Sequence, residues 1–383
     1  MYQTIVFEKK TGKIIKILKN QYIRTQTQLA RLLGLPSIHN LSYIYFPHDI
    51  DINPDDYYVK APAPNTPYQL FSKDDTLLTL KIVQEKARKL INHSSIIDIV
   101  FEGGTGDYML QADVVYQLTQ KHPEKGFNLY VDPSRIPILR LILNTENITF
   151  FPTSQKPKET NSYIRFADIT QLGYYNPPYG KVATYCYIAG INPDVPISTI
   201  RIPPHLEEQA QNIISSLYPD NNTPRIALHR QSGEPNPKTW PWQQSWLFMT
   251  ELYKKYNIPT LLIGGYGEQI AECEYILNGL GIWEWDLLAA ILSQFHAIIA
   301  IDSAIMHIAH RLHIPVITLW GPTTPDYILP NILHRNIIQG TCPKIGCMQY
   351  ACNSNQCMLS ITPEQVLKEL EKIINLNNHH NET

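Results

Sequence analysis

The stretch Ile301–Pro325 constrains the fold of this chain most tightly, because it joins a helical pattern to buried-strand patterns within a short distance. The run that leads into it, Ala297–Ile301, is apolar without interruption, which predicts a strand buried on both faces. Val316–Trp320 predicts a second such strand. Between them, apolar residues three and four positions apart predict a helix that begins at Asp302 or Ser303, both helix-capping residue types. In a parallel sheet, such a strand–helix–strand unit places the helix N-terminus and the following loop at one edge.

A second unit of the same kind lies earlier in the chain. Ile96–Phe101 predicts a strand, Tyr108–Gln120 a helix and Phe127–Val131 the next strand. The loop before the helix is rich in glycine and places Asp107 at the start of the helix; its glycines are Gly103, Gly104 and Gly106. An aspartate at this position most often caps the helix, and the alternative is a base held at the edge of a cleft. Because a glycine-rich turn by itself is a weak signal of function, the sequence pattern alone favours the capping role for Asp107.

A third unit opens the C-terminal half of the chain. Ile226–His229 predicts a strand, a polar loop follows, and a helix is expected from Trp240 or Pro241 to Tyr256. Thr260–Ile263 then predicts a strand that ends in the pair Gly264 and Gly265. Lys238 lies just before the helix. Such a lysine usually faces solvent, but beside helix N-termini at the edge of a sheet it could neutralise a diphosphate.

The rest of the chain divides into a module before these units and a tail after them. Residues 1–95 show no catalytic pattern and predict an appended module for recognition or assembly, with a hairpin at 5–18 and helices at 27–33 and 74–91. We therefore expect three parts: this N-terminal extension, a domain over 96–205 and a domain over 206–383. A last helix, 364–376, is expected to cross back to the first of these domains.

Composition narrows the class of protein. The chain has 383 residues, 44% of them hydrophobic and 17% charged, which is typical of a soluble globular protein with two or three cores. A formal net charge of -2 provides no basic surface, so neither nucleic acid nor an anionic membrane is an expected partner. Charged residues interrupt the N-terminus and no apolar run is long enough to span a membrane. We expect a cytoplasmic protein.

Four motifs, taken in order, resemble those of the ADP-heptose:heptosyltransferase family, glycosyltransferase family nine. They are GGTGD, ALHRQSGEPNPKTWP, LLIGGYGE and IDSAIMHIAHRLHIPVITLWGPTTP, within residues 96 to 374. The resemblance implies an α/β fold of the GT-B type, in which two Rossmann-like domains face each other across a cleft. Here that fold would follow an N-terminal α+β or β-rich extension. It also implies an inverting glycosyltransferase that transfers a hexosyl or heptosyl group without a metal ion in the chemistry.

The resemblance also implies roles for single residues. Asp107 matches the aspartate that deprotonates the acceptor hydroxyl, which reverses the preference for a cap, and Lys238 matches the lysine that meets the donor phosphates. Asp302 and the residues after it match the donor site, where a helix N-terminus favours phosphate. The implied donor-binding residues are Gly104, Gly106, Gly264, Gly265, Asp302, Ser303, Ala304, Met306, His307, Gly321, Pro322 and Thr323. Without the resemblance, His307 would be interpreted as a packing histidine.

The substrates follow from the resemblance in part. It implies a nucleotide diphosphate sugar as donor, with ADP-heptose suspected, and a hydroxyl acceptor on lipopolysaccharide or on protein. Peripheral membrane association and a homo-oligomer stay open. Two alternatives remain: a catalytically inactive GT-B protein that binds nucleotides or serves in assembly, and a nucleotide-sugar epimerase. The presence of both Asp107 and Lys238 favours the transferase.

A cluster of cysteines near the C-terminus has its own pattern. Cys342, Cys347, Cys352 and Cys357 recur with four residues between neighbours. Four thiolates could form a tetrahedral zinc or iron site, although the pair separated by two residues that is usual in metal fingers is missing. Disulfides and four unrelated thiols are the alternatives, and a cytoplasmic compartment argues against disulfides. An extension combined with a cysteine-rich segment also resembles family members that glycosylate proteins.

Overall fold

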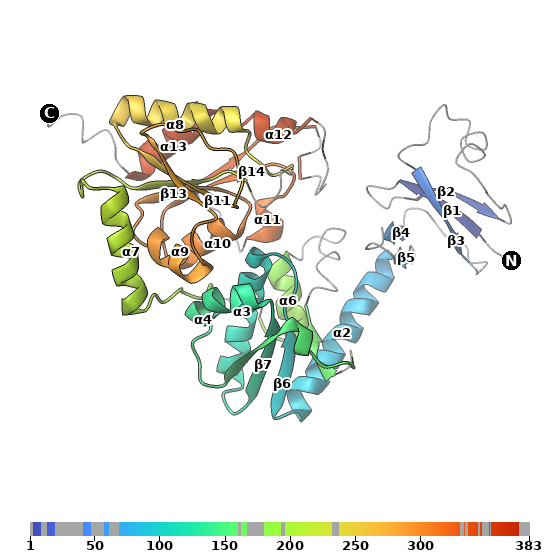
Figure 1. Cartoon of the computed structure of the whole chain (residues 1–383). Helices are drawn as coiled ribbons and strands as arrows, with labels where there is room; N and C mark the ends of the chain where they lie inside the picture. Colours follow the sequence, from blue (N-terminus) through green and yellow to red (C-terminus); the bar gives the residue numbers. More distant parts are fainter. Residues whose placement is uncertain are drawn as a thin grey trace. The chain divides into compact units, whose positions relative to one another are not determined.

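The protein is described by a computed structural model (Figure 1). It describes residues 3–8, 14–19, 41–46, 57–60, 69–159, 162–166, 180–192, 196–231, 237–329, 333, 336–343, 345–346, 352 and 354–374. Contacts between residues divide the chain into two compact units, Met1–Val83 and Gln84–Thr383. Among the described helices, none has the length and apolar character needed to cross a membrane.

The first unit contains antiparallel strands. Strand β1 (Gln3–Glu8) lies between β2 (Ile14–Lys19) and β3 (Leu41–Phe46). Its pairing with β2 confirms the predicted hairpin. Strands β4 (Tyr57–Lys60) and β5 (Gln69–Ser72) form a separate antiparallel pair. Helix α2 (Lys73–His93) contains the helix predicted at 74–91, whereas the helix predicted at 27–33 lies outside the described residues.

The second unit begins within α2, which is followed by a four-stranded parallel sheet in the order β8-β7-β6-β9. The strands β6 and β7 confirm the predicted pair; the bounds are β6 (Ile96–Val100), β7 (Gly126–Val131), β8 (Ile148–Pro152) and β9 (Ile164–Arg165). The helices that accompany this sheet are α3 (Thr105–Lys121), α4 (Ile136–Ile142) and α6 (Lys181–Ala189). We call this sheet with these helices the first lobe. The strands β6 and β7 are largely buried, as their apolar runs predict.

A six-stranded parallel sheet follows, in the order β12-β11-β10-β13-β14-β15. Its strands are β10 (Ile226–His229), β11 (Thr260–Gly264), β12 (Ile276–Leu280), β13 (Ala297–Ile301), β14 (Val316–Trp320) and β15 (Ile337–Gln339). The predicted bounds of β10, β13 and β14 are confirmed residue for residue. With the helices α7 (Pro204–Leu217), α8 (Trp242–Tyr256), α9 (Trp285–Leu292), α10 (Ala304–Arg311), α11 (Pro325–Ile328), α12 (Gln356–Leu359) and α13 (Pro363–Ile374), this sheet forms the second lobe.

The helices of the second lobe cover both faces of its sheet. Figure 1 shows α8 and α13 on one side of the sheet and α9 and α10 on the other. The expectation that the last helix crosses back to the first lobe is wrong, because α13 packs against α8, β13 and β14. Its buried residues Val366, Leu367 and Leu370 belong to the core of the second lobe. Lys255 and Tyr256 of α8 also donate hydrogen bonds to Glu371 at 2.8 Å.

The order of the strands decides where a site can form. In each sheet, the second and third strands in the sequence lie on one side of the first strand, and the later strands lie on the other side of that first strand. This order leaves a gap between the carboxyl ends of β6 and β9 in one lobe and of β10 and β13 in the other. Ligands of doubly wound folds bind at such gaps. Contacts of α3 with α10 and of α4 with α9 bring the two lobes together.

Candidate active site

The loop after β6 forms the wall of the site on the first lobe. Gly103 has a φ of 102°, a left-handed conformation that a side chain would strain, and this turn directs the chain into α3. The carboxylate of Asp107, in the first turn of α3, accepts a hydrogen bond from the backbone N–H of Gly104 at 2.9 Å. Asp107 therefore does stabilise the helix N-terminus, as the capping interpretation predicts. This hydrogen bond uses Oδ2, so the other carboxylate oxygen, Oδ1, remains available for a second contact.

The second oxygen of Asp107 meets a lysine that no sequence motif indicates. Lys181, the first residue of α6, donates from Nζ to Asp107 Oδ1 at 2.5 Å. Their side chains are 14% and 24% exposed, so water screens this ion pair only in part. The ammonium group of Lys181 and the backbone N–H of Gly104 together fix the orientation of the carboxylate.

Arg135 completes the polar wall of the first lobe. Its Nε donates to Thr105 Oγ1 at 3.2 Å and its guanidinium lies 4.6 Å from the centre of the Tyr108 ring. Asp132 pairs with the same guanidinium at 3.3 Å. The two cations that line this wall among the described residues, Arg135 and Lys181, are therefore both paired with carboxylates.

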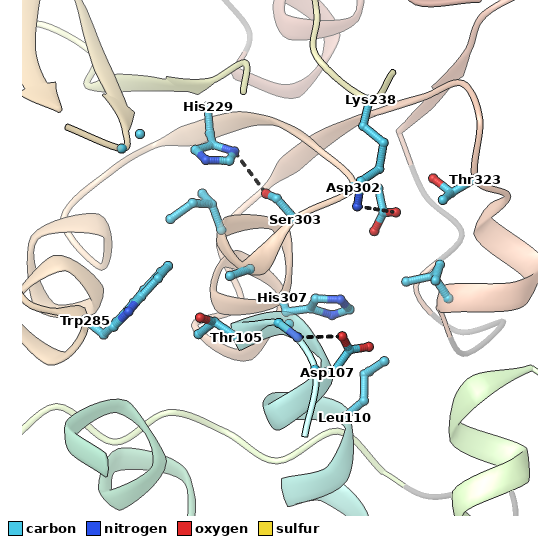
Figure 2. Close-up of a pocket in the computed structure, with 18 of the residues that line it drawn as sticks. Thr105, Asp107, Leu110, His229, Lys238, Trp285, Asp302, Ser303, His307 and Thr323 are labelled. Carbon is cyan, nitrogen blue, oxygen red and sulfur yellow. Dashed lines mark hydrogen bonds and ion pairs between the residues drawn. The ribbon is translucent and has the colours of Figure 1, made fainter. Parts of the chain in front are cut away.

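The wall on the second lobe forms where β10 and β13 end. Ser303 is the N-cap residue of α10, yet its side chain makes no capping hydrogen bond. Its Oγ instead shares a hydrogen bond with Nδ1 of His229, the last residue of β10, at 3.0 Å (Figure 2). Asp302 does not cap the helix either, because its Oδ2 accepts from Lys238 Nζ at 3.4 Å. The helix therefore begins at Ser303, as predicted, but no side chain caps it, and the first turn of α10 keeps its amide groups for a ligand.

Two buried histidines lie at this wall, and both are neutral at pH 7. Burial lowers the pKa of His229 to about 3, and the charges of Lys238 and Arg230 add to this effect. Burial also lowers the pKa of His307 well below its usual value, with Arg311, His310, Lys181 and Lys238 contributing. Neutral imidazoles can donate or accept hydrogen bonds, but they add no positive charge for a phosphate. Lys238 is thus the main cation of this wall.

His307 is also one of the points at which the two lobes touch. Its ring lies against Gly106, where an added methyl group would come within 2.8 Å of Cδ2. Gly106 is therefore glycine because a side chain of the other lobe occupies the adjacent space. Figure 2 shows His307 between Asp107 on one side and the pair of Asp302 with Lys238 on the other. The ring nitrogen Nδ1 of His307 is buried without a hydrogen-bond partner among the described atoms.

The two walls enclose a pocket of about 730 Å³, which is large enough for a nucleotide sugar. Most of the predicted site residues line it: Asp107, Lys238, Gly104, Gly106, Gly264, Gly265, Asp302, Ser303, Ala304, His307, Pro322 and Thr323. Met306 and Gly321 do not line it. Met306 is fully buried, and Gly321 packs against Cys357 and Met358. Thr323 Oγ1 is buried without a partner among the described atoms, so a ligand could use it.

Several lining residues are not predicted from the sequence. Lys181, Arg135, His229 and Trp285 belong to this group. His229 could have been found, because it is the last residue of a strand predicted to end at the ligand edge of the sheet. Lys181 gives no such indication, since it follows a segment without recognisable chemistry and meets Asp107 across 74 residues. Trp285 begins α9 and points into the pocket in Figure 2.

The cysteine segment does not form a metal centre from its described residues. No group of three or more His, Cys, Asp or Glu side chains is placed to hold a metal ion among the residues that the structure describes. Cys347 lies outside those residues. Of the others, Cys357 is buried beside Gly321, Cys342 is half-buried and Cys352 is exposed. The zinc or iron prediction therefore has no support from the structure.

Solved structures with this arrangement of two lobes define the class of fold. The structure of E. coli ADP-heptose lipopolysaccharide heptosyltransferase II matches with a TM-score of 0.52 and 15% identity, over 74% of this chain and 99% of that one. A glycosyltransferase family 9 structure from Veillonella parvula matches with a TM-score of 0.54 and 17% identity, over 73% and 97%. TibC from enterotoxigenic E. coli, described as an iron-containing dodecameric glycosyltransferase, gives 0.55 and 14%, over 72% and 75%. The second unit has the GT-B fold of these proteins.

Sequence comparison finds similarity to heptosyltransferases over part of the chain. Residues 185–358, a little under half of the chain, match glycosyltransferase family 9 (heptosyltransferase). Lipopolysaccharide heptosyltransferase 2 of Escherichia coli K12 is 32% identical over 111 residues, which are 28% of this chain and 30% of that protein. Lipooligosaccharide heptosyltransferase 2 of Haemophilus ducreyi is 25% identical over 204 residues, 47% and 57% of the two chains. The chain thus aligns with roughly a third to just over half of the length of these relatives. The matched residues include Lys238 and Asp302 but not Asp107.

Proposed function

We propose that the protein is an inverting glycosyltransferase that moves a sugar from a nucleotide diphosphate sugar to an acceptor hydroxyl. One observation carries the proposal: the carboxylate of Asp107 and the cation of Lys238 line the same pocket from opposite lobes. A base on one wall and a phosphate-binding group on the other are what a direct displacement requires. The heptosyltransferase relatives and the family 9 domain support the same reaction class.

The second lobe would bind the donor. The diphosphate fits between Lys238 and the uncapped first turn of α10, where backbone N–H groups and the helix dipole favour an anion. Thr323 would add its hydroxyl from the loop after β14. As the bond to the sugar breaks, negative charge grows on the leaving diphosphate. Lys238 and these amides stabilise that charge more in the transition state than in the bound donor.

The first lobe would activate the acceptor. Asp107 takes the proton of the acceptor hydroxyl while the hydroxyl oxygen attacks the anomeric carbon of the donor sugar. The new glycosidic bond forms on the face opposite the leaving group, the bond to the diphosphate breaks, and a nucleoside diphosphate leaves. Lys181 and the Gly104 amide hold the carboxylate in one orientation during this step. No covalent enzyme intermediate is needed, and neither is a metal ion in the chemistry.

The finer identity of the substrates is part of the proposal. ADP-heptose is the proposed donor, supported by the heptosyltransferase relatives and by the name of the E. coli ADP-heptose enzyme. The acceptor would be a hydroxyl on a lipopolysaccharide glycan or on a protein. A homo-oligomer is also proposed, since the similar structure of TibC is described as dodecameric.

A screen of nucleotide sugars tests the proposal. The purified chain is incubated with ADP-, UDP- and GDP-linked sugars, and binding is measured by calorimetry and hydrolysis by release of the nucleoside diphosphate. Binding and slow hydrolysis of an ADP-linked heptose, with weaker binding of the UDP and GDP sugars, is the expected result. A preference for UDP or GDP would change the donor, and no binding of any nucleotide sugar would refute the function.

A structural metal at the cysteine segment is a separate proposal. It is supported by the regular spacing of Cys342, Cys347, Cys352 and Cys357 and by the description of TibC as iron-containing. Four thiolates would supply the soft ligands that zinc or iron prefers. Metal analysis of the purified protein tests it, with one equivalent expected. A metal-free folded protein would remove the site without affecting the proposed chemistry.

A further inference from the structure

An ion pair between the two lobes lies buried behind the pocket. Arg311, the last residue of α10, donates from Nη2 to Oδ2 of Asp113, which lies within α3. The two side chains are only 1% and 3% exposed. Burial raises the pKa of Asp113 and lowers that of Arg311, whereas the attraction between them opposes both changes. A charge that loses its partner here would be buried without compensation.

The pair is held by hydrogen bonds from both lobes. The same Nη2 of Arg311 donates to the carbonyl of Met109 in α3 at 3.0 Å, and Nη1 donates to the carbonyl of His307 in α10 at 3.1 Å. The backbone N–H of Ser198 donates to the other oxygen of Asp113 at 2.9 Å. The planar guanidinium therefore contacts α3 at two points while it is itself fixed to α10. A lysine, with one nitrogen, could not reproduce this bridge.

The two helices joined in this way carry the two halves of the proposed chemistry. Asp107 lies in the first turn of α3, and the uncapped first turn of α10 would hold the diphosphate. Near these ends the helices meet a second time, where Gly106 contacts His307. Two contacts, one at the pocket and one behind it, set both the distance and the angle between the helices. A displacement of about 1 Å between reacting groups can slow an enzyme about 100-fold.

We propose that Asp113 and Arg311 are positioning residues that align the acceptor base with the donor diphosphate. This inference rests on the proposed function. Stability alone does not explain the pair, because replacing a buried ion pair by apolar residues of similar size is often neutral or stabilising. The pair acts on the relation between the lobes, so its loss slows transfer while each lobe keeps its own ligand contacts. The donor wall, which lies entirely on the second lobe, should bind nucleotide as before.

The test replaces both charges at once, since either single change risks unfolding the protein. The double variant Asp113→Leu/Arg311→Met removes the ion pair and keeps similar side-chain volumes. We expect it to fold, to bind ADP with a Kd within about twofold of wild type, and to release ADP from the donor at least about tenfold more slowly. Arg311→Lys keeps the charge pair and loses part of the bridge, so its turnover should lie between those of wild type and the double variant.

A matched control uses an ion pair within one lobe. Lys255 of α8 and Glu371 of α13 form an ion pair with a distance of 2.8 Å between Nζ and Oε1, and neither residue lines the pocket. The variant Lys255→Met/Glu371→Leu should therefore keep wild-type turnover. Turnover of the Asp113→Leu/Arg311→Met variant equal to that of this control would overturn the proposal. A turnover of Arg311→Lys that is no higher than that of the double variant would also overturn the proposal.

Hydrogen exchange gives a readout that does not depend on activity. In the double variant, amides of residues 102–107 and of the first turn of α10 should exchange at least about fivefold faster than in wild type, and those of β11 should not change. Unchanged exchange at the pocket would contradict the positioning role whatever the turnover. A wild-type protein without nucleotide binding or turnover would instead refute the proposed function, and the exchange data would still decide the inference.

Discussion

Removing the charge of Lys238 should weaken the binding of a nucleoside diphosphate by about 30-fold. Two unit charges 4 Å apart attract by about 1 kcal/mol in water and about 4 kcal/mol at the effective dielectric of a protein surface. The Lys238 side chain is 29% exposed, which puts its interaction with a diphosphate between these limits, at about 2 kcal/mol. Lys238→Met removes the ammonium group and keeps most of the aliphatic stem, so the loss reports charge more than packing.

Calorimetry with two ligands separates this effect from a general disturbance of the site. The Kd of ADP should rise about 30-fold in Lys238→Met, whereas the Kd of adenosine, which has no phosphate, should change less than about twofold. Lys238→Arg keeps the charge and should lose much less affinity for ADP. The difference between wild type and Lys238→Met should also shrink as salt is added, because the lysine is partly exposed.

Asp302 makes the expected loss larger. Its carboxylate accepts from Lys238 at 3.4 Å and is only 8% exposed, so in Lys238→Met it would face the diphosphate without a cation between them. The double variant Lys238→Met/Asp302→Asn should therefore recover part of the lost affinity. An ADP Kd in Lys238→Met within about twofold of wild type would refute the placement of the diphosphate beside this lysine.

Three further predictions concern single groups of the pocket. Gly106→Ala should slow turnover and lower the free energy of unfolding by about 1–3 kcal/mol, because the added methyl group would press on His307. Gly126→Ala is the control, since its methyl group would lie 3.5 Å from the nearest side-chain atom. Equal turnover in the two variants would contradict the contact between Gly106 and His307. Thr323→Val should weaken ADP binding by about 1 kcal/mol, about fivefold, and an unchanged Kd in calorimetry would remove the hydroxyl from the donor site. His229, with a folded pKa of about 3, binds its proton more readily in the unfolded chain, so stability should be full above about pH 6.5 and fall with acid, by about 2 kcal/mol at pH 5. Urea unfolding at pH 7.5 and pH 5 measures this loss, which His229→Gln should reduce; an equal loss in wild type and variant would contradict the assignment.

The strands and most helices could be predicted because their patterns are local. An unbroken apolar run such as Ala297–Ile301 has few alternatives to a buried strand, and the structure confirms it without a shift of either end. The same reasoning identified the loops at the ligand edge, and together with the family motifs it selected Asp107, Lys238 and Asp302, which all line the pocket. The helix 364–376 shows the limit of this reasoning. Its apolar face is evident from sequence, but the surface that covers this face is not.

Partners far apart in the chain could not be predicted in the same way. Lys181 reaches Asp107 across 74 residues and Arg311 reaches Asp113 across 198. Neither pair leaves a local pattern, because an ion pair depends on how whole elements pack and not on spacing. The partner of Ser303 could not be predicted either. Serine is a good helix-capping residue by type, yet the hydroxyl of Ser303 forms a hydrogen bond with His229 at the end of β10. A tertiary partner that is already buried nearby outweighs the local preference.

In the proposed reaction, Asp107 supplies the base and the second lobe binds the donor, so catalysis and donor binding are divided between the lobes. Comparing wild type with Asp107→Ala tests this division most directly, by measuring the Kd of ADP-heptose in calorimetry and the release of ADP from the same donor. Asp107 lies on the first lobe, and the proposed diphosphate site on the second. We predict an unchanged Kd and a release rate at least about 100-fold lower in the variant. Release of ADP by Asp107→Ala at the wild-type rate would contradict the account.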